Sequence, residues 1–150
     1  MALVLPKLSR RGISPPGNSD QAPSVEVAFC ERNCRYVAGQ RMNVQWRSSS
    51  PLGAFICGLE ASILWFTEGK GETDLQVHAF NHWTANELAK INTIEWNGFS
   101  CYLPYYPLSY AGNLLRIRWC CRVRLLCDDG VDRFMEKTFL LSSRTDMLDC

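Results

Sequence analysis

The sequence has no long apolar run and almost no net charge. Its longest apolar stretches, such as residues 63–66, are far shorter than the about 20 residues that a membrane-spanning helix needs. Sixteen Lys and Arg oppose 15 Asp and Glu, so no overall field attracts nucleic acid or an anionic membrane. Basic residues follow the apolar segment 1–5, which is the wrong order for a secretory signal. We therefore expect no transmembrane segment, no nucleic-acid partner and a cytoplasmic location.

Histidine is scarce, and the common catalytic motifs are missing. His78 and His82 are the only imidazoles, and no Gly-x-Ser-x-Gly sequence is present. Residues 68–71 superficially resemble a phosphate loop, but they lack its spacing and the Ser or Thr after the lysine, so they predict a turn. We predict no catalytic residue and no enzymatic activity. A hydrolase that uses Cys and His on a β scaffold stays as an alternative, to be tested with a thiol probe.

Cysteine, by contrast, is abundant, with eight residues. In a cytoplasmic protein the thiols are expected to be reduced. Cys30 and Cys34 have the spacing of a zinc-binding pair, but Cys120 and Cys121 point to opposite faces of one strand and do not complete a tetrahedral site. We therefore predict no metal and no cofactor. A second alternative is an extracellular immunoglobulin-like recognition domain with a disulfide between Cys57 and Cys121.

Breaker-rich composition and periodicity divide the chain. Pro, Gly and Ser dominate the first residues, which predicts a flexible arm over residues 1–24, one domain over 25–142 and a short tail over 143–150. From Val25 onward apolar and polar residues alternate, as on strands with one buried face. Such strands are predicted at residues 25–29, 42–46, 57–66, 75–80, 114–127 and 131–141, with β-favouring residues at 92–96 and one or two helical turns within 82–90.

The strongest strand signal lies in residues 114–127. Apolar residues occupy the odd positions from 115 to 127, and four arginines occupy even ones: Arg116, Arg118, Arg122 and Arg124. A helix would scatter these arginines around its circumference, whereas a strand places them on one face. Asp129-Gly130 then provides a hairpin turn, so residues 131–141 should return antiparallel. About seven or eight strands without a long helix predict an all-β, antiparallel, immunoglobulin-like sandwich.

Three segments, in this order, resemble the arrestin-like N-terminal domain. They are residues 36–42 (YVAGQRM), residues 99–104 (FSCYLP), and residues 107–112 (PLSYAG) with Ile117-Arg118-Trp119. The resemblance covers about residues 25–141. It implies an arrestin-like sandwich that serves as a non-enzymatic, protein-binding scaffold or a trafficking or signalling adaptor, as in arrestins and bacterial sporulation-control proteins. Val25-Glu26-Val27 stands where arrestins carry the basic residues that sense phosphate, so that property is not transferred.

Two kinds of surface are candidates for partner binding. The arginines of residues 116–124 stand about 6.5–7 Å apart at alternate positions, which suits an acidic or phosphorylated ligand. Carboxylates of neighbouring strands, such as Glu136, or plain solvent are the alternative partners of these arginines. Phe66, Tyr105 and Tyr106 are candidate loop anchors for a protein partner, or equally caps on the end of the sandwich. Addition of a strand at a sheet edge is the other mode of contact that this architecture offers.

Overall fold

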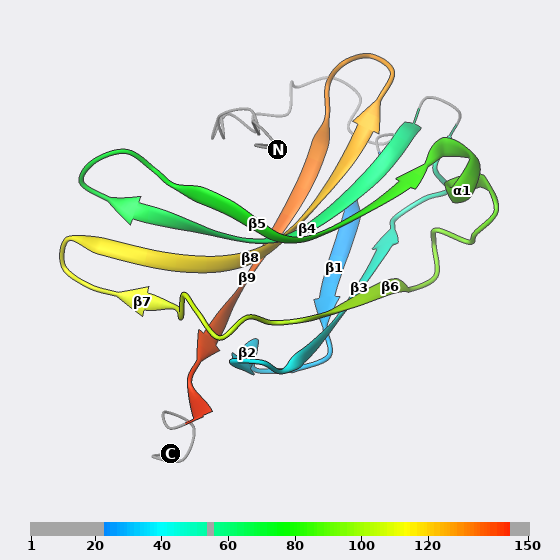
Figure 1. Cartoon of the computed structure of the whole chain (residues 1–150). Helices are drawn as coiled ribbons and strands as arrows, with labels where there is room; N and C mark the ends of the chain where they lie inside the picture. Colours follow the sequence, from blue (N-terminus) through cyan, green and yellow to red (C-terminus); the bar gives the residue numbers. More distant parts are fainter. Residues whose placement is uncertain (1–22, 54–55, 145–150) are drawn as a thin grey trace.

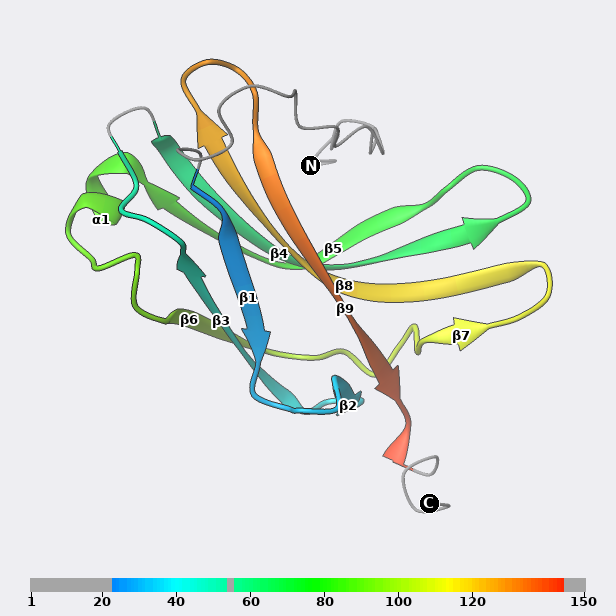
Figure 2. The same cartoon turned by 180° about the vertical axis from the view of Figure 1, so that it is seen from behind.

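Two β-sheets make up the chain in the computed structural model, which describes residues 23–53 and 56–144 (Figure 1). The first sheet has the order β1-β3-β6, and the second has the order β2-β9-β8-β4-β5, with β7 paired to β8. The first sheet contains β1 (Val25–Phe29), β3 (Arg41–Ser48) and β6 (Asn97–Tyr102). The second contains β2 (Arg35–Val37), β4 (Ile56–Gly69), β5 (Leu75–Thr84), β7 (Tyr110–Ala111), β8 (Leu115–Cys127) and β9 (Arg133–Ser142). Seen from both sides, the strands curl together into a half-barrel (Figures 1 and 2).

The all-β prediction is confirmed, but the expectation of a wholly antiparallel fold is wrong. β2 pairs in parallel with β9, so that Arg35 faces Leu140. Nine strands are described, against the seven or eight expected. The additional ones, β2 and β7, have only three and two residues, which is too short for an alternating pattern to be visible in the sequence. β2 pairs with β9, which lies far along the chain, so no local turn indicates this parallel partner. β7 pairs with β8 across a hairpin.

The core lies between the two sheets and contains the largest aromatic side chains. Trp46 from β3 and Trp119 from β8 are fully buried, and so is Tyr36 from β2. Phe29, Tyr36 and Phe139 meet edge to face, with ring centroids 5.6–6.2 Å apart. This is a favoured geometry for aromatic pairs, and it joins β1, β2 and β9 at one end of the core.

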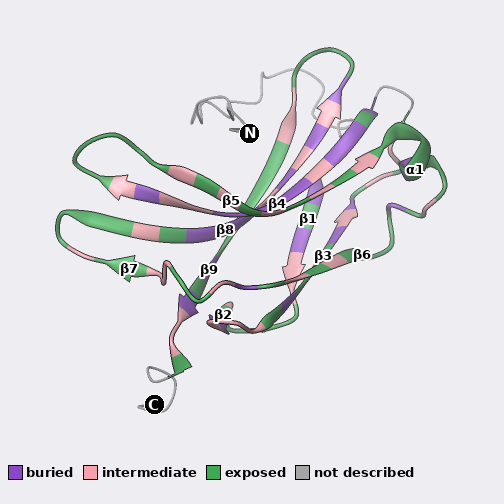
Figure 3. Ribbon diagram, in the orientation of Figure 1, coloured by how far each residue is buried: buried purple, intermediate pink, exposed green. Residues whose placement is uncertain are grey.

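The alternation predicted for β8 is confirmed over most of its length. Its odd positions from Trp119 to Cys127 are buried, and β9 returns antiparallel after the turn at Gly130 (Figure 3). Leu115 is exposed because this end of β8 extends beyond the first sheet, with β4 and β5 alongside it (Figure 1). Cys120 departs from the pattern, since it is fully buried on the arginine face beside Leu64.

The connection between β5 and β6 contains one short helix, α1 (Ala85–Ala89). Thr84 caps it, and Glu87 completes the capping box, while Leu88 packs into the core. Residues 92–96, whose composition favours β structure, form no strand. Asn97 closes a turn there instead, because its side-chain amide donates to the carbonyls of Asn92 and Glu95, both at 2.9 Å.

The predicted arm and tail fall largely outside the described residues. Only residues 23 and 24 of the arm, and 143 and 144 of the tail, are described. In the part of the chain that the structure describes, no helix has the length and apolar character required to cross a bilayer.

Candidate functional site: the tyrosine loop

The loop between β6 and β7, residues 103–109, is held at both ends, and we call it the tyrosine loop. At its start, Leu103 exchanges two backbone hydrogen bonds with the β2–β3 turn, to Gly39 (3.1 Å) and Gln40 (2.9 Å). At its end, the Ser109 amide donates to the carbonyl of Leu141 on β9, and the Ser109 hydroxyl accepts from the Leu141 amide at 2.8 Å. The loop is therefore held at one end by the β2–β3 turn and at the other by β9.

Two adjacent tyrosines project from this loop. Tyr105 is 79% exposed and Tyr106 is 81% exposed. The ring of Tyr105 nevertheless lies against Gly39, where a Cβ atom would come within 2.9 Å of the Tyr105 hydroxyl oxygen. Gly39 has φ +80°, a left-handed conformation that glycine adopts without steric cost. The Tyr105 ring therefore packs against the β2–β3 turn.

A hollow of about 540 Å³ lies beside the loop, and we call it the tryptophan hollow. Three strands and the loop contribute its walls: Trp65, Gln76, Val77, His78, Pro104, Tyr106, Pro107 and Trp119. The β4–β5 register shifts between Ile63 and Leu64, so His78 has no opposite partner and its side chain turns toward β6. There His78 Nε2 lies 2.8 Å from the carbonyl oxygen of Tyr102. Because a carbonyl only accepts, Nε2 carries the proton.

A second hollow, of about 490 Å³, opens where β8 and β9 diverge, and we call it the arginine hollow. The β8–β9 ladder ends at Trp119 and Phe139, and β7 takes over the edge of β8 from Ile117. Arg116 and Arg118 line this hollow with Tyr110, and none of its lining residues is acidic. Trp119 lines both hollows, so the two are neighbours that share one residue.

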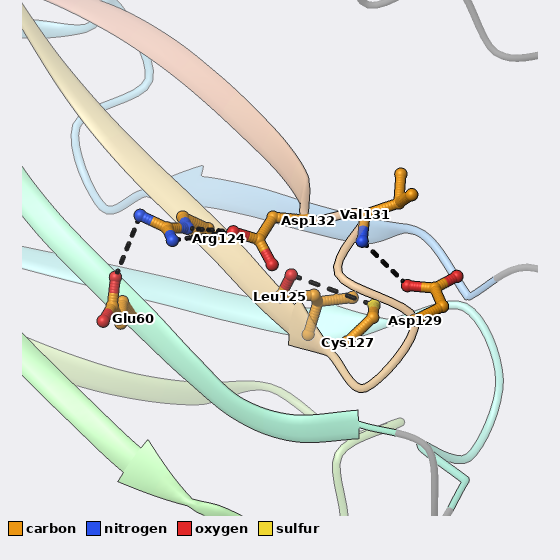
Figure 4. Close-up of polar contacts among 7 residues, drawn as sticks. All are labelled: Glu60, Arg124, Leu125, Cys127, Asp129, Val131 and Asp132. Atoms are coloured by element: carbon orange, nitrogen blue, oxygen red, sulfur yellow. Dashed lines mark hydrogen bonds and ion pairs between the residues drawn. The ribbon is translucent and has the colours of Figure 1, made fainter. Parts of the chain in front are cut away.

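The predicted arginine ladder is largely neutralised by ion pairs. Arg118 lies 3.3 Å from Glu68, and Arg122 lies 2.8 Å from Glu136. Arg124 lies between Glu60 of β4, at 3.7 Å, and Asp132 beyond the turn, at 2.7 Å (Figure 4). Among the described residues, Arg116 has no ion pair. The buried Cys120 separates Arg116 and Arg118 from the other two arginines.

The structure brings together only part of the predicted site. Tyr105 and Tyr106 lie on the tyrosine loop, and Tyr106 lines a hollow that shares Trp119 with the hollow lined by Arg116 and Arg118. Arg122 and Arg124 lie farther along β8, toward its other end. The expectation that Phe66 is a loop anchor is wrong, because β4 continues to Gly69 and Phe66 is a half-buried strand residue facing Arg118.

Sequence reasoning missed four residues of the two hollows. Trp65 and Trp119 occupy alternating apolar positions that read as ordinary core, and His78 lies in a strand whose bulge has no sequence signature. Tyr110 belongs to a strand of two residues. Its ring lies over Gly112, and this glycine is the sequence feature that could have indicated close packing at Tyr110.

The cysteines do not form the predicted alternative sites. Cys57 precedes Gly58, which faces Leu126, whereas Cys121 faces Ile63, so the two cysteines lie about 20 Å apart along the strands. The prediction of a disulfide between Cys57 and Cys121 is therefore wrong. Within residues 23–53 and 56–144, no three His, Cys, Asp or Glu side chains are placed to hold a metal ion.

Two further thiols are shielded from solvent. Burial raises the pKa of the Cys120 thiol to about 12, and burial also raises the pKa of Cys121. A thiol that stays protonated at neutral pH is a poor nucleophile.

Comparison with known proteins supports the fold. No family model matches the sequence, and no curated protein matches it. Among solved structures, the chain is similar to Spo0M, a sporulation control protein from Bacillus subtilis, with a TM-score of 0.57 and 12% sequence identity. The match covers 85% of this chain and 54% of that one, so the chain spans about half the length of Spo0M. At this identity the likeness shows the fold alone, which is all-β and similar to that of Spo0M.

Proposed function

We propose that this chain is a non-enzymatic scaffold module, an arrestin-like sandwich that binds a protein partner through the tyrosine loop. The observation that carries the proposal is the exposure of Tyr105 and Tyr106 on a loop whose two ends are hydrogen-bonded, one to the β2–β3 turn and the other to β9. Tyrosine is enriched at binding hot spots because it offers a large, rigid contact area at low entropic cost. A loop that is already ordered loses little further freedom on binding.

Two further observations support a regulatory binding role. The structural neighbour Spo0M is described as a sporulation control protein, which is a regulatory and not a catalytic description. The buried, protonated thiols of Cys120 and Cys121 fit a reducing, cytoplasmic location and offer no reactive nucleophile. An adaptor in trafficking or signalling is the corresponding cellular role.

The proposal is tested by affinity capture with matched variants, followed by quantitative mass spectrometry. The double substitution Tyr105→Ser with Tyr106→Ser removes both exposed rings of the loop. The control is Val131→Ser with Phe134→Ser, which removes two exposed apolar side chains at the β8–β9 hairpin, at the other end of β8. We expect the loop variant to lose a partner that the wild type and the control both retain. Retention by the loop variant, or equal loss by both variants, contradicts the proposal.

A further inference from the structure

We propose that the tryptophan hollow binds a proline-containing, uncharged segment of a partner protein in the extended polyproline conformation. This inference rests on the proposed protein-binding function and names the chemistry that the partner presents to the loop. Tyr106 belongs both to the loop and to the wall of the hollow, so a partner that contacts the loop also meets the hollow.

The walls of the hollow are uncharged and rich in flat rings. None of its eight lining residues is Asp, Glu, Lys or Arg, although charged residues lie on the same sheet. The rings that a ligand can reach are those of Trp65, His78 and Tyr106. Trp119, opposite Trp65 in the β4–β8 register, is fully buried and meets the His78 ring edge to face at 6.0 Å, so it holds these rings in place. An uncharged ligand is required here, since a charge would lose its hydration without gaining a partner. Aromatic-lined grooves are the surfaces on which proline-rich segments dock.

The hydrogen-bonding groups of the hollow divide into two sets. Trp119 Nε1 already donates to the carbonyl oxygen of Pro107 at 2.8 Å, and His78 Nε2 already donates to Tyr102. The indole N–H of Trp65 and the hydroxyl of Tyr106 have no hydrogen-bond partner among the described residues. Two donors thus remain free at the edge of a rigid aromatic wall.

This arrangement favours proline over other residues. A proline residue presents a carbonyl oxygen, which accepts from Trp65 or Tyr106, and it has no backbone N–H. Any other residue would bring an N–H toward ring faces that offer it no acceptor, which weakens binding. The preformed polyproline helix also loses little conformational entropy on binding.

The inference is tested by following the Trp65 indole N–H of the full chain by nuclear magnetic resonance. The probe is a blocked ten-residue peptide of Ala-Pro-Pro repeats, and the control peptide has glycine in place of every proline. We expect the proline peptide to shift the Trp65 signal downfield, as a new hydrogen bond does, and the control peptide to leave it unchanged. Equal shifts with both peptides, or none with either, overturn the inference, and so does a larger shift with tetramethylammonium, which would assign a cation cage.

Variants locate the binding within the hollow. Trp65→Phe keeps a ring but removes the donor, and Tyr106→Ala removes part of the wall. For these two variants the readout is titration of the peptide by calorimetry, and each should weaken binding about tenfold. Tyr102→Ala is the matched control, because this exposed tyrosine side chain lies outside the hollow, and its affinity should equal that of the wild type. Loss of binding in Tyr102→Ala as well would overturn the placement.

The two proposals fail in different ways. If the proline peptide does not bind but the Tyr105 and Tyr106 double variant still loses its captured partner, the ligand chemistry is wrong and the binding function stands. If the peptide binds but capture is unaffected, the hollow is a peptide site separate from the proposed partner contact.

Discussion

At the scale of single residues, burial decides what each charged side chain contributes. Arg122 and Glu136 pair at 2.8 Å with side-chain exposures of 11% and 34%, and the second guanidinium nitrogen of Arg122, Nη2, is buried without a partner. Arg47 and Glu26 pair at the same distance with exposures of 42% and 52%. Both pairs join an arginine to a glutamate, but only in the first is the guanidinium group largely shielded from solvent.

We therefore predict that Glu136→Gln destabilises the protein much more than Glu26→Gln does. The first substitution leaves a nearly buried guanidinium without its counter-charge, which should cost about 1.5–3 kcal/mol. The second removes an exposed pair, worth at most about 1 kcal/mol. Urea unfolding followed by tryptophan fluorescence measures both. Equal losses would mean that Arg122 is better hydrated than its burial indicates.

At the scale of elements, one turn supports the tyrosine loop. Gly39 and Gly130 have nearly the same backbone conformation, with φ +80° and +79°. A Cβ atom at Gly130 would meet nothing within 4 Å, whereas one at Gly39 would meet the ring of Tyr105 at 2.9–3.1 Å. The two glycines therefore separate the cost of the backbone from the contact with the loop.

The prediction is that Gly39→Ala and Gly130→Ala lower stability similarly but differ at the loop. Each places a Cβ in the left-handed region, at a cost of about 1–2 kcal/mol. Only Gly39→Ala should displace the exposed Tyr105 ring, shift its resonances and weaken capture of the partner. Thermal unfolding and the spectrum of labelled tyrosine check the two parts. An unchanged Tyr105 signal in Gly39→Ala would show that the turn does not position the ring.

At the scale of the whole molecule, the cysteines report on cooperative unfolding and on the redox state. Cys30 and Cys57 are exposed, whereas Cys120 and Cys121 are buried at adjacent positions in the middle of β8. Both faces of the sheet are covered at this point, so the two buried thiols become accessible only when β8 separates from its neighbours.

We predict fast native-state alkylation at Cys30 and Cys57, and at least about 10³-fold slower reaction at Cys120 and Cys121. Mass spectrometry after timed labelling measures the rates at each position. The two slow rates should match, since one opening event exposes both thiols. Labelling of Cys120 or Cys121 in the native protein at the rate of Cys30 would contradict the prediction.

The sequence by itself determined the all-β class and most of the strands. In residues 115–127 the alternation of apolar residues with arginine fits only an extended chain, and the Asp129-Gly130 turn fixes the antiparallel return of β9. The alternation and the turn each involve residues that are close in sequence, so both structures can be predicted without knowing the fold. Tyr105 and Tyr106 were likewise predicted from the sequence, as loop residues.

Only the tertiary structure decided which residues share a site. The parallel β2–β9 pair, the bulge that turns His78 toward β6, and the meeting of Trp65, Trp119 and Tyr106 join positions far apart in the chain. The same holds for the carboxylates that neutralise Arg118, Arg122 and Arg124. A periodic pattern tells which face a side chain takes, but not which strand lies beside it, because pairing is settled by packing of the whole core.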